Sequence, residues 1–546
     1  MTRLARGGHP ETTRRPAVPD PARDESLATS RPSAEPDAAR DESLATSRPL
    51  AEPDAAGTGA FHRAFFSGLT PGSTPFGVAD ELASYYDAPG EPSNVHLEAR
   101  VPGHLDGAAL RAATEAALAA QPRARVRRAA RGRWRLRQVW EVPARPDRAV
   151  VTTATWAGEE ELDRERERFL AAAPSLDGSP PLRVLLAAGP GEDRVILNAH
   201  HSALDGLSCL ELLRSIARHY PGGSGTDGSG ADADQVVARP AGTGPAGTGP
   251  AGTSPAGTSP AGTSPIGRDA AGAGALSPDA GPAPGPQAAR SGRPVAAGWL
   301  QAGVARIAAD RAEDDGRDRS GSVFCLLPPR PVPTARPGRA TVNDLLIAGL
   351  IVAVGRWNAG HGRPAGRIRI TMPVNARPAG SDGAAGNLSR LTSVTAAAPA
   401  DRDPELSALI ADVAAQTRSA KDHAGPQVDP VSRVWAAPWA PPAVKRRLLR
   451  LGLRTAGHLL CDTSLVSNLG VVADPPRFGG AAVSGLWFST SAHMPRGVSA
   501  GAVTIGGRLH LCLRCRRALF GEPAAARFAG MYGAALDDIT GAGRPL

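Results

Sequence analysis

The hydrophobic pattern of the first half of the chain predicts strands and helices in turn. Short apolar runs and alternating segments predict strands, and apolar residues three and four positions apart predict amphipathic helices. The expected strands are Val95–Val101, Arg125–Arg128, Trp134–Trp140, Leu182–Ala187 and Arg194–Ala199, and the expected helices are Gly107–Ala120 and the segment after Gly206.

The second half shows the same mixture, which predicts an α/β fold class. Thr341, followed three residues later by Asp344, predicts a capped helix start, and Gly506-Gly507 predicts a hairpin turn. The expected helices are Trp299–Ala309, the segment after Thr341, Pro404–Ser419 and Pro523–Asp538, and the expected strands are Arg367–Met372, Ala502–Ile505 and Arg508–Leu513.

Two tracts lack this periodicity. The first holds a tandem repeat, in which Ala22–Asp37 recurs as Ala39–Asp54, and the second holds AGT(G/S)P pentads between Ala241 and Pro265. Such sequences bury too little apolar surface to offset the entropy lost on ordering. We therefore expect a disordered tail at 1–58, a folded part at 59–220, a disordered linker at 221–297 and a second folded part at 298–546.

The seven residues His200–Gly206, with the sequence HHSALDG, are the most informative for chemistry. They join the apolar strand Val195–Leu197 to an amphipathic helix. Neutral imidazole accepts a proton near neutral pH, and a strand can hold the ring rigidly towards a cleft. Neighbouring residues of a strand point to opposite sides, so one of the two rings suffices as a general base.

Other interpretations of the histidine pair stay open. Such a pair is often a surface feature or a satisfied core feature, and it can be half of a metal site. A metal is disfavoured, because adjacent histidines diverge in a strand and no nearby Cys or Glu supplies further ligands. Asp205 is expected to anchor the turn through an ion pair, and Gly206 to allow close backbone packing.

The net charge of +9 does not predict a nucleic-acid-binding protein. Only two lysines occur, aromatic residues make up 4% of the chain, and no nucleic-acid-binding motif is present, so the arginine excess is compositional. One basic cluster, Lys445–Arg454, has Arg446, Arg450 and Arg454 at helical spacing. A solvated helix face, an acidic carrier protein, coenzyme A phosphates and a membrane surface all fit this cluster.

The cysteines and the apolar segments indicate a soluble cytoplasmic protein. Five scattered cysteines form no disulfide framework, and the CxxC pair Cys512 and Cys515 has no second pair beside it. No apolar run precedes Pro10, unlike in a signal peptide. The most apolar window, Leu345–Val354, is far shorter than the roughly 20 residues that a bilayer requires.

The HHSALDG segment resembles the HHxxxDG signature of one enzyme superfamily. That superfamily includes chloramphenicol acetyltransferase-like enzymes, nonribosomal peptide condensation domains, plant BAHD acyltransferases, polyketide-associated acyltransferases and wax ester synthases. Further segments resemble it in the same order, within residues 60–220 and 298–540. They are Leu105–Ala113 with Gln121-Pro122, Pro181–Arg183, Thr341–Leu346, Pro373–Arg377 and Ser467–Gly470.

The resemblance implies a two-lobed architecture and roles for the motif residues. The implied fold is two chloramphenicol acetyltransferase-like α/β sandwich lobes in a V, with HHxxxDG at the floor of an active-site tunnel between them. The lobes would be 59–220 and 298–546. The resemblance further implies that His201 is the general base and that His200 and Gly206 support the site.

The resemblance also assigns residues outside the histidine pair. Asp205 matches a structural aspartate that pairs with an arginine of the other lobe, for which Arg377 is the first candidate and Arg183 the second. Ser467 and Asn468 would line the tunnel or donate to an oxyanion, and a polar strand end explains them equally well.

The implied function is acyl transfer from a coenzyme A or carrier-protein thioester to a hydroxyl or amine of a specialised metabolite or lipid. No bound cofactor or metal is expected, because the acyl-coenzyme A or phosphopantetheine-linked acyl group is a co-substrate. An acidic acyl- or peptidyl-carrier protein is an expected partner; nucleic acid and a transmembrane segment are not, and peripheral membrane contact stays open. The alternatives are a stand-alone condensation enzyme acting on two carrier-bound substrates and a non-catalytic recruitment module, against which the intact motif argues.

Overall fold

The computed structural model describes residues 73–130, 136–222, 304–311, 319–333, 336–363, 366–377, 386–399, 403–422 and 430–541. The chain divides into two compact units, Met1–Gly68 and Leu69–Leu546, and all described residues belong to the second. The tail predicted at 1–58 and the linker predicted at 221–297, apart from residues 221–222, lie outside the described residues. Their disorder stays a prediction.

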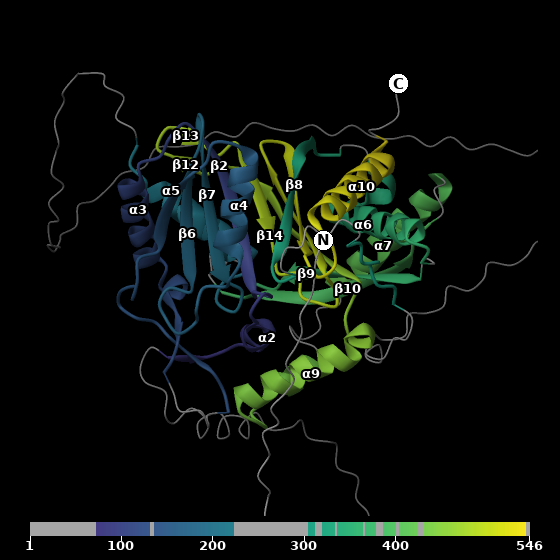
Figure 1. Ribbon diagram of the computed structural model, residues 1–546, viewed down its shortest axis with the longest axis horizontal. Coiled ribbons are helices and arrows are strands. Elements are labelled where there is room, and N and C mark those ends of the chain that lie inside the picture. Colours follow the sequence, from purple (N-terminus) through teal and green to yellow (C-terminus); the bar gives the residue numbers. More distant parts are fainter. Residues whose placement is uncertain are drawn as a thin grey trace, which may run out of the picture. The chain divides into compact units, whose positions relative to one another are not determined.

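A five-stranded sheet carries the histidine pair (Figure 1). Its strand order is β14-β2-β7-β6-β5, in which β5 and β6 are parallel and the other neighbours are antiparallel. The strands are β2 (Asn94–Pro102), β5 (Val151–Thr155), β6 (Leu182–Ala188), β7 (Glu192–His200) and β14 (Gly485–Ser489).

Helices pack on both faces of this sheet. Along β7, Val195 and Leu197 belong to the core beneath α3 (Gly107–Ala120) and α5 (Gly206–His219). Ile196 instead belongs to a small cluster with Leu162 of α4 (Glu159–Leu170). Because strand side chains alternate, His200 is placed on the same face as Ile196.

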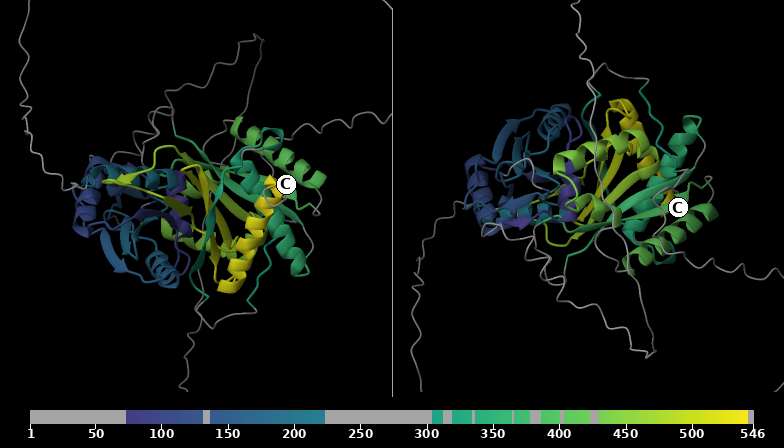
Figure 2. Two further views of the ribbon diagram at one scale, coloured as in Figure 1. Left: turned by 90° about the horizontal axis from the view of Figure 1, so that it is seen from above. Right: turned by 90° about the horizontal axis from the view of Figure 1, so that it is seen from below.

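A six-stranded sheet forms the other half of the core, with the order β10-β9-β11-β15-β16-β8. It packs against α6 (Val342–Gly360), α7 (Asp403–Asp422) and α10 (Glu522–Thr540), which Figures 1 and 2 show on one side of it. The strands are β8 (Ser322–Pro331), β9 (Arg367–Asn375), β10 (Ser389–Ala397), β11 (Ser464–Val472), β15 (Val498–Ile505) and β16 (Arg508–Arg516).

The central helix of the second half begins as predicted. Thr341 accepts a hydrogen bond from the Asp344 N–H, and the Asp344 side chain accepts one from the Thr341 N–H. This helix, α6, is the one described helix long and apolar enough to cross a membrane, but most of it is buried inside the protein. It is a core helix of the second half.

Three helices form a separate layer. α2 (Val78–Tyr86) contacts both α8 (Pro430–Ala436) and α9 (Pro442–Leu460). The remaining elements are β1 (Thr74–Pro75), β3 (Arg127–Arg128), β4 (Val139–Glu141), β12 (Arg477–Phe478), β13 (Ala481–Ala482) and the 3-10 turns Pro122–Arg125 and Pro337–Arg339.

The α/β fold class is confirmed, and two local predictions were wrong. The described part of the helix predicted at Trp299–Ala309 is extended: Val304 bridges to Arg367, and the Ala305 N–H donates to the Arg367 carbonyl. Pairing with β9 therefore prevails over the local helical pattern. Of the strand predicted at Arg125–Arg128, only Arg127–Arg128 form a strand, β3, and Arg125 is the last residue of a 3-10 turn.

The solvated basic face predicted for Lys445–Arg454 was also wrong in part. Arg454 is exposed, but Lys445 is fully buried and lies 3.5 Å from Glu81 of α2. Arg450 donates a hydrogen bond to the carbonyl of Asp87. Two cations of α9 therefore attach this helix to α2 and to the residue that ends α2.

One strand connects the two halves. β14 follows β11 in sequence, yet it pairs with β2 and completes the first sheet, with Trp487 opposite Glu98. Its backbone also meets β15 closely: a Cβ added to Gly501 would lie 1.9 Å from the Phe488 carbonyl oxygen. The two sheets thus share a contact that only glycine permits.

Replacing Gly501 by alanine is expected to lower the free energy of unfolding by about 1–3 kcal/mol or more, because backbone rather than a flexible side chain must move. Gly530 of α10 is the control, since a Cβ added there meets nothing within 4 Å. Gly530→Ala should leave stability unchanged or raise it by about 1 kcal/mol. Chemical denaturation of both variants checks this; equal stabilities would contradict the close contact.

Candidate active site around His201

The two adjacent histidines lie where β7 ends, and backbone hydrogen bonds hold both. The His200 N–H donates to the Pro181 carbonyl at 2.9 Å, and the His201 N–H donates to the Ser93 carbonyl at 2.9 Å. Strands β6 and β2 flank β7 on either side. The end of β7 is therefore fixed from both neighbouring strands, as a positioned catalytic ring requires.

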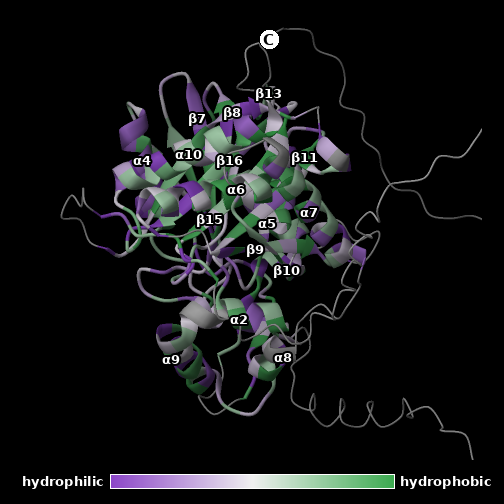
Figure 3. Ribbon diagram, turned by 90° about the vertical axis from the view of Figure 1, so that its right-hand side faces the viewer, coloured by the Kyte–Doolittle hydropathy of each residue, from purple (hydrophilic) through white to green (hydrophobic). Residues whose placement is uncertain are grey.

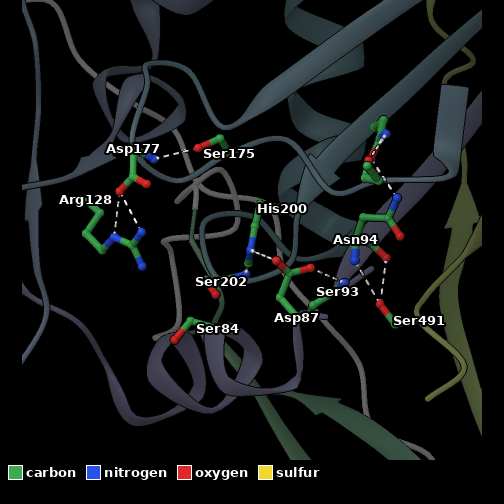
Figure 4. Close-up of polar contacts among 12 residues, drawn as sticks. Ser84, Asp87, Ser93, Asn94, Arg128, Ser175, Asp177, His200, Ser202 and Ser491 are labelled. Atoms are coloured by element: carbon green, nitrogen blue, oxygen red, sulfur yellow. Dashed lines mark hydrogen bonds and ion pairs between the residues drawn. The ribbon is translucent and has the colours of Figure 1, made fainter. Parts of the chain in front are cut away.

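Side-chain contacts hold the ring of His200 inside the protein (Figure 4). Its Nδ1 accepts a hydrogen bond from the Ser202 N–H at 3.1 Å, and its Nε2 lies 3.8 Å from an oxygen of Asp87. The other Asp87 oxygen accepts from the Ser93 N–H at 3.0 Å. With Nδ1 serving as an acceptor, the ring carries its proton on Nε2, facing Asp87. His200 is thus committed to structure.

Asp87 keeps its charge in this arrangement. Burial alone would raise the pKa of this carboxyl. The nearby ring of His200 and the hydrogen bond from the Ser93 N–H outweigh burial and hold the pKa of Asp87 below its ordinary value. An ionised Asp87 stabilises the Nε2–H tautomer of His200.

The ring of His201 is placed differently. The residue is partly exposed, whereas its Nδ1 is buried and has no hydrogen bond to another described residue. A neutral imidazole carries a free lone pair on one of its nitrogens, which is the form a general base needs.

Burial also lowers the pKa of His201 from its ordinary value of 6.5. Its own carbonyl and the negative charge of Asp205 act in the opposite direction but do not cancel the effect of burial. The ring is therefore neutral at pH 7.

Asp205 carries the ion pair expected from the sequence. Its two carboxylate oxygens accept hydrogen bonds from the two terminal nitrogens of Arg377 at 2.7 and 3.0 Å, a bidentate arrangement. The side chains of Asp205 and Arg377 are 3% and 1% exposed. The second candidate, Arg183, instead donates to the carbonyls of Phe169 and Ala172. The partner of Asp205 is therefore Arg377, and the Arg183 alternative was wrong.

Asp205 also organises the backbone around it. It caps α5 by accepting from the Ser208 N–H at 2.9 Å, and it accepts from the Leu388 N–H at 3.1 Å. The Ser208 hydroxyl lies between Gly386 and Arg377 and bonds to both. Burial raises the pKa of Asp205, but Arg377 more than offsets this, so the pKa lies below its ordinary value.

Gly206 permits the close packing that its position predicts. A Cβ there would lie 2.6 Å from side-chain carbons of Leu469 and of Phe488. The segment containing Ser467 and Asn468 is thereby brought beside the motif through Leu469. Ser467 is buried on β11, and the Asn468 side chain accepts from the Gly470 N–H at 2.9 Å. Among the described residues, no hydrogen bond joins either side chain to His201. Their roles in lining a tunnel or binding an oxyanion stay predictions.

Some residues around the histidine pair were not predicted from the sequence. Asp87 lies in a segment without a motif, and Gly386 follows β9 after a stretch that is not described. Ser202 lies inside the motif, and its buried hydroxyl has no hydrogen-bond partner in the described structure. No group of three or more His, Cys, Asp or Glu placed to hold a metal occurs among the described residues.

Comparison with known proteins assigns the chain to a family. No family model matches it. Over 474 residues the chain is 30% identical to Uncharacterized protein Rv2305 of Mycobacterium tuberculosis (strain ATCC 25618 / H37Rv), covering 80% of this chain and 93% of that protein. Uncharacterized protein MT2362 of Mycobacterium tuberculosis (strain CDC 1551 / Oshkosh) matches equally well. The chain belongs to the family of these mycobacterial proteins.

Solved structures show the fold of this family member. The first condensation domain of the CDA synthetase superposes with a TM-score of 0.51 at 14% identity, covering 86% of this chain and 97% of that domain. The same values hold for the first condensation domain of the calcium-dependent antibiotic synthetase in complex with substrate analogue 3a. The condensation-domain fold implied by the HHxxxDG resemblance is confirmed.

Removing either partner of the Asp205–Arg377 pair is expected to cost about 3–5 kcal/mol of stability, because the other charge stays buried and unpaired. Asp205→Ala combined with Arg377→Ala should cost clearly less than the sum of the two single changes. Glu165→Ala is the control, since its partner Arg168 is 69% exposed, and it should change stability by less than about 1 kcal/mol. Urea denaturation measures all four variants; strict additivity would argue against the pairing.

Proposed function

We propose that this protein is an acyltransferase in which His201 is the general base. The single observation that carries the proposal is the contrast between the two rings. Both nitrogens of His200 face groups of the protein, whereas the ring of His201 is partly exposed on a fixed backbone and is neutral at pH 7. The condensation-domain fold and the HHSALDG motif support the same assignment.

The reaction proposed is direct transfer from a thioester. Nε2 of His201 takes a proton from the hydroxyl or amine of the acceptor as that atom attacks the thioester carbonyl. The tetrahedral intermediate then collapses, its carbon–sulfur bond breaks, and the departing thiolate takes the proton back from His201 as a thiol. The step needs no covalent enzyme intermediate and no metal or cofactor from the protein.

Asp205, Arg377, His200 and Asp87 are positioning residues in this proposal. They contact the backbone and the neighbours of His201, not the reacting atoms. Ser467 and Asn468 remain candidates for stabilising the oxyanion. The next residue, Leu469, lies against Gly206 and brings this segment beside the motif.

The donor is proposed to be coenzyme A or a carrier protein. The solved neighbours come from a peptide synthetase, and the likeness covers almost a whole condensation domain. This favours, as a second candidate, a stand-alone condensation enzyme whose two substrates both arrive on carriers. Acyl-coenzyme A and acyl-carrier donors, assayed in parallel against one panel of free and carrier-bound acceptors, separate the two candidates.

His201→Ala is expected to lower turnover by about 10²- to 10⁴-fold, the usual contribution of a general base, and to leave the fold intact. His219→Ala is the matched control, since His219 lies at the exposed end of α5, and among the described residues its ring bonds to the Ser215 carbonyl of the same helix. It should retain full turnover. A His201→Ala variant that keeps the biological activity of the protein would instead favour a non-catalytic recruitment module.

The pH profile gives a second test. Only neutral His201 can accept a proton, and its pKa is lowered, so kcat/KM should be flat through pH 7 and fall only below pH 6.5. The direction follows from the sign of the shift: protonation, which inactivates the ring, needs a more acidic solution than for free histidine. A fall in kcat/KM centred above pH 7 would contradict the assignment. So would an acidic fall that persists in the residual activity of His201→Ala.

A further inference from the structure

The helix α9 buries a lysine and exposes several of its large apolar side chains, unlike an ordinary surface helix. Lys445 points inward, is 0% exposed and lies 3.5 Å from Glu81. Leu448 and Leu451, three and six residues later, are 43% and 58% exposed. A surface helix normally exposes its charged side chains to water and buries its leucines against the core. The buried ion pair fixes the rotation of α9, so the leucines cannot turn inward.

The exposed apolar residues form a stripe along α9. Val444, Leu448 and Leu451 follow the spacing of four and three that places side chains on one side of a helix, and all are exposed. Val434 of α8 and Trp439 of the turn before α9 are also exposed. Nine large apolar side chains are exposed in the described structure, and these five fall within eighteen consecutive residues. Figure 3 shows α8 and α9 together beside α2.

Charges of one sign accompany the stripe. The sequence from 430 to 461 contains no Asp or Glu. Arg447 and Arg454 are exposed on α9, among the leucines of the stripe, and Arg433 is exposed on α8. An anionic, partly apolar surface is therefore complementary to this region.

The mixture of arginine and leucine on one narrow face favours a lipid bilayer over a protein partner. The core of a protein interface is depleted of charged side chains. At a membrane, headgroup phosphates and hydrocarbon lie within a few ångströms of each other, so arginine can reach the phosphates while leucine enters the acyl region. Tryptophan also prefers this boundary.

We propose that the outward surface of α8 and α9, defined as Arg433, Val434, Trp439, Val444, Arg447, Leu448, Leu451 and Arg454, docks on anionic lipid bilayers. The stripe enters the headgroup region and the arginines bind lipid phosphates. The docking is peripheral, because no part of α9 has to leave its contacts with α2. The proposal does not rest on the acyl-transfer function.

Co-sedimentation of the full chain with vesicles tests the proposal. Vesicles of phosphatidylcholine with phosphatidylglycerol should bind the protein, and phosphatidylcholine alone should bind it much less. Raising the salt from about 0.1 to 0.5 M should weaken binding. Leu448→Ser with Leu451→Ser should reduce the partition coefficient at least about tenfold, because two apolar side chains no longer enter the bilayer.

Leu391→Ser with Val471→Ser is the matched control. These residues are 64% and 73% exposed but lie on β10 and β11, outside the α8–α9 surface, so vesicle binding should not change. Arg447→Ala with Arg454→Ala should weaken binding and reduce its dependence on salt. The proposal would be overturned if the protein did not bind vesicles, or if the control variant lost as much binding as Leu448→Ser with Leu451→Ser. It would also be overturned if the protein formed a soluble dimer that dissociates in the Leu448 and Leu451 variant but not in the control.

Discussion

The carboxylate of Asp205 holds together parts of the chain that are far apart in sequence. It begins α5, which follows the histidine pair, and it binds Arg377 at the end of β9 and the backbone at Leu388 before β10. The position of the His201 ring therefore depends on a contact between the halves of the molecule. Because the pair is almost fully buried, water cannot replace either partner, and this makes the contact specific as well as strong.

Two chemically identical side chains have different surroundings at the end of β7. Alternation along β7 directs His200 into the protein, where Asp87 and the Ser202 N–H define its tautomer. His201, one residue later, bonds through its backbone to Ser93 and is partly exposed. The Asp87 carboxylate thus acts on this loop through His200 and the Ser93 N–H.

Local patterns predicted much of this structure. The Thr341 capping box, the helix Gly107–Ala120 and the Asp205–Arg377 pair were all predicted from sequence and are present. What sequence patterns missed depends on distant neighbours. The Asp87 contact has no motif, Val304–Asp310 is extended because it pairs with β9 and with Phe520, and Lys445 is buried because Glu81 lies opposite it. Periodicity describes one segment at a time and carries no information about such partners.

The placement of β14 has a consequence for how the protein is made. During synthesis, residues 94–220 emerge from the ribosome long before residue 489, yet β2 is an inner strand only once β14 has paired with it. Until then β2 is an open edge, the kind of surface on which nascent chains associate with one another. The first sheet therefore completes late, through a pairing of very high sequence separation, which is slow to form. A fragment ending after α5 would lack β14 and would leave β2 as the open edge of its sheet.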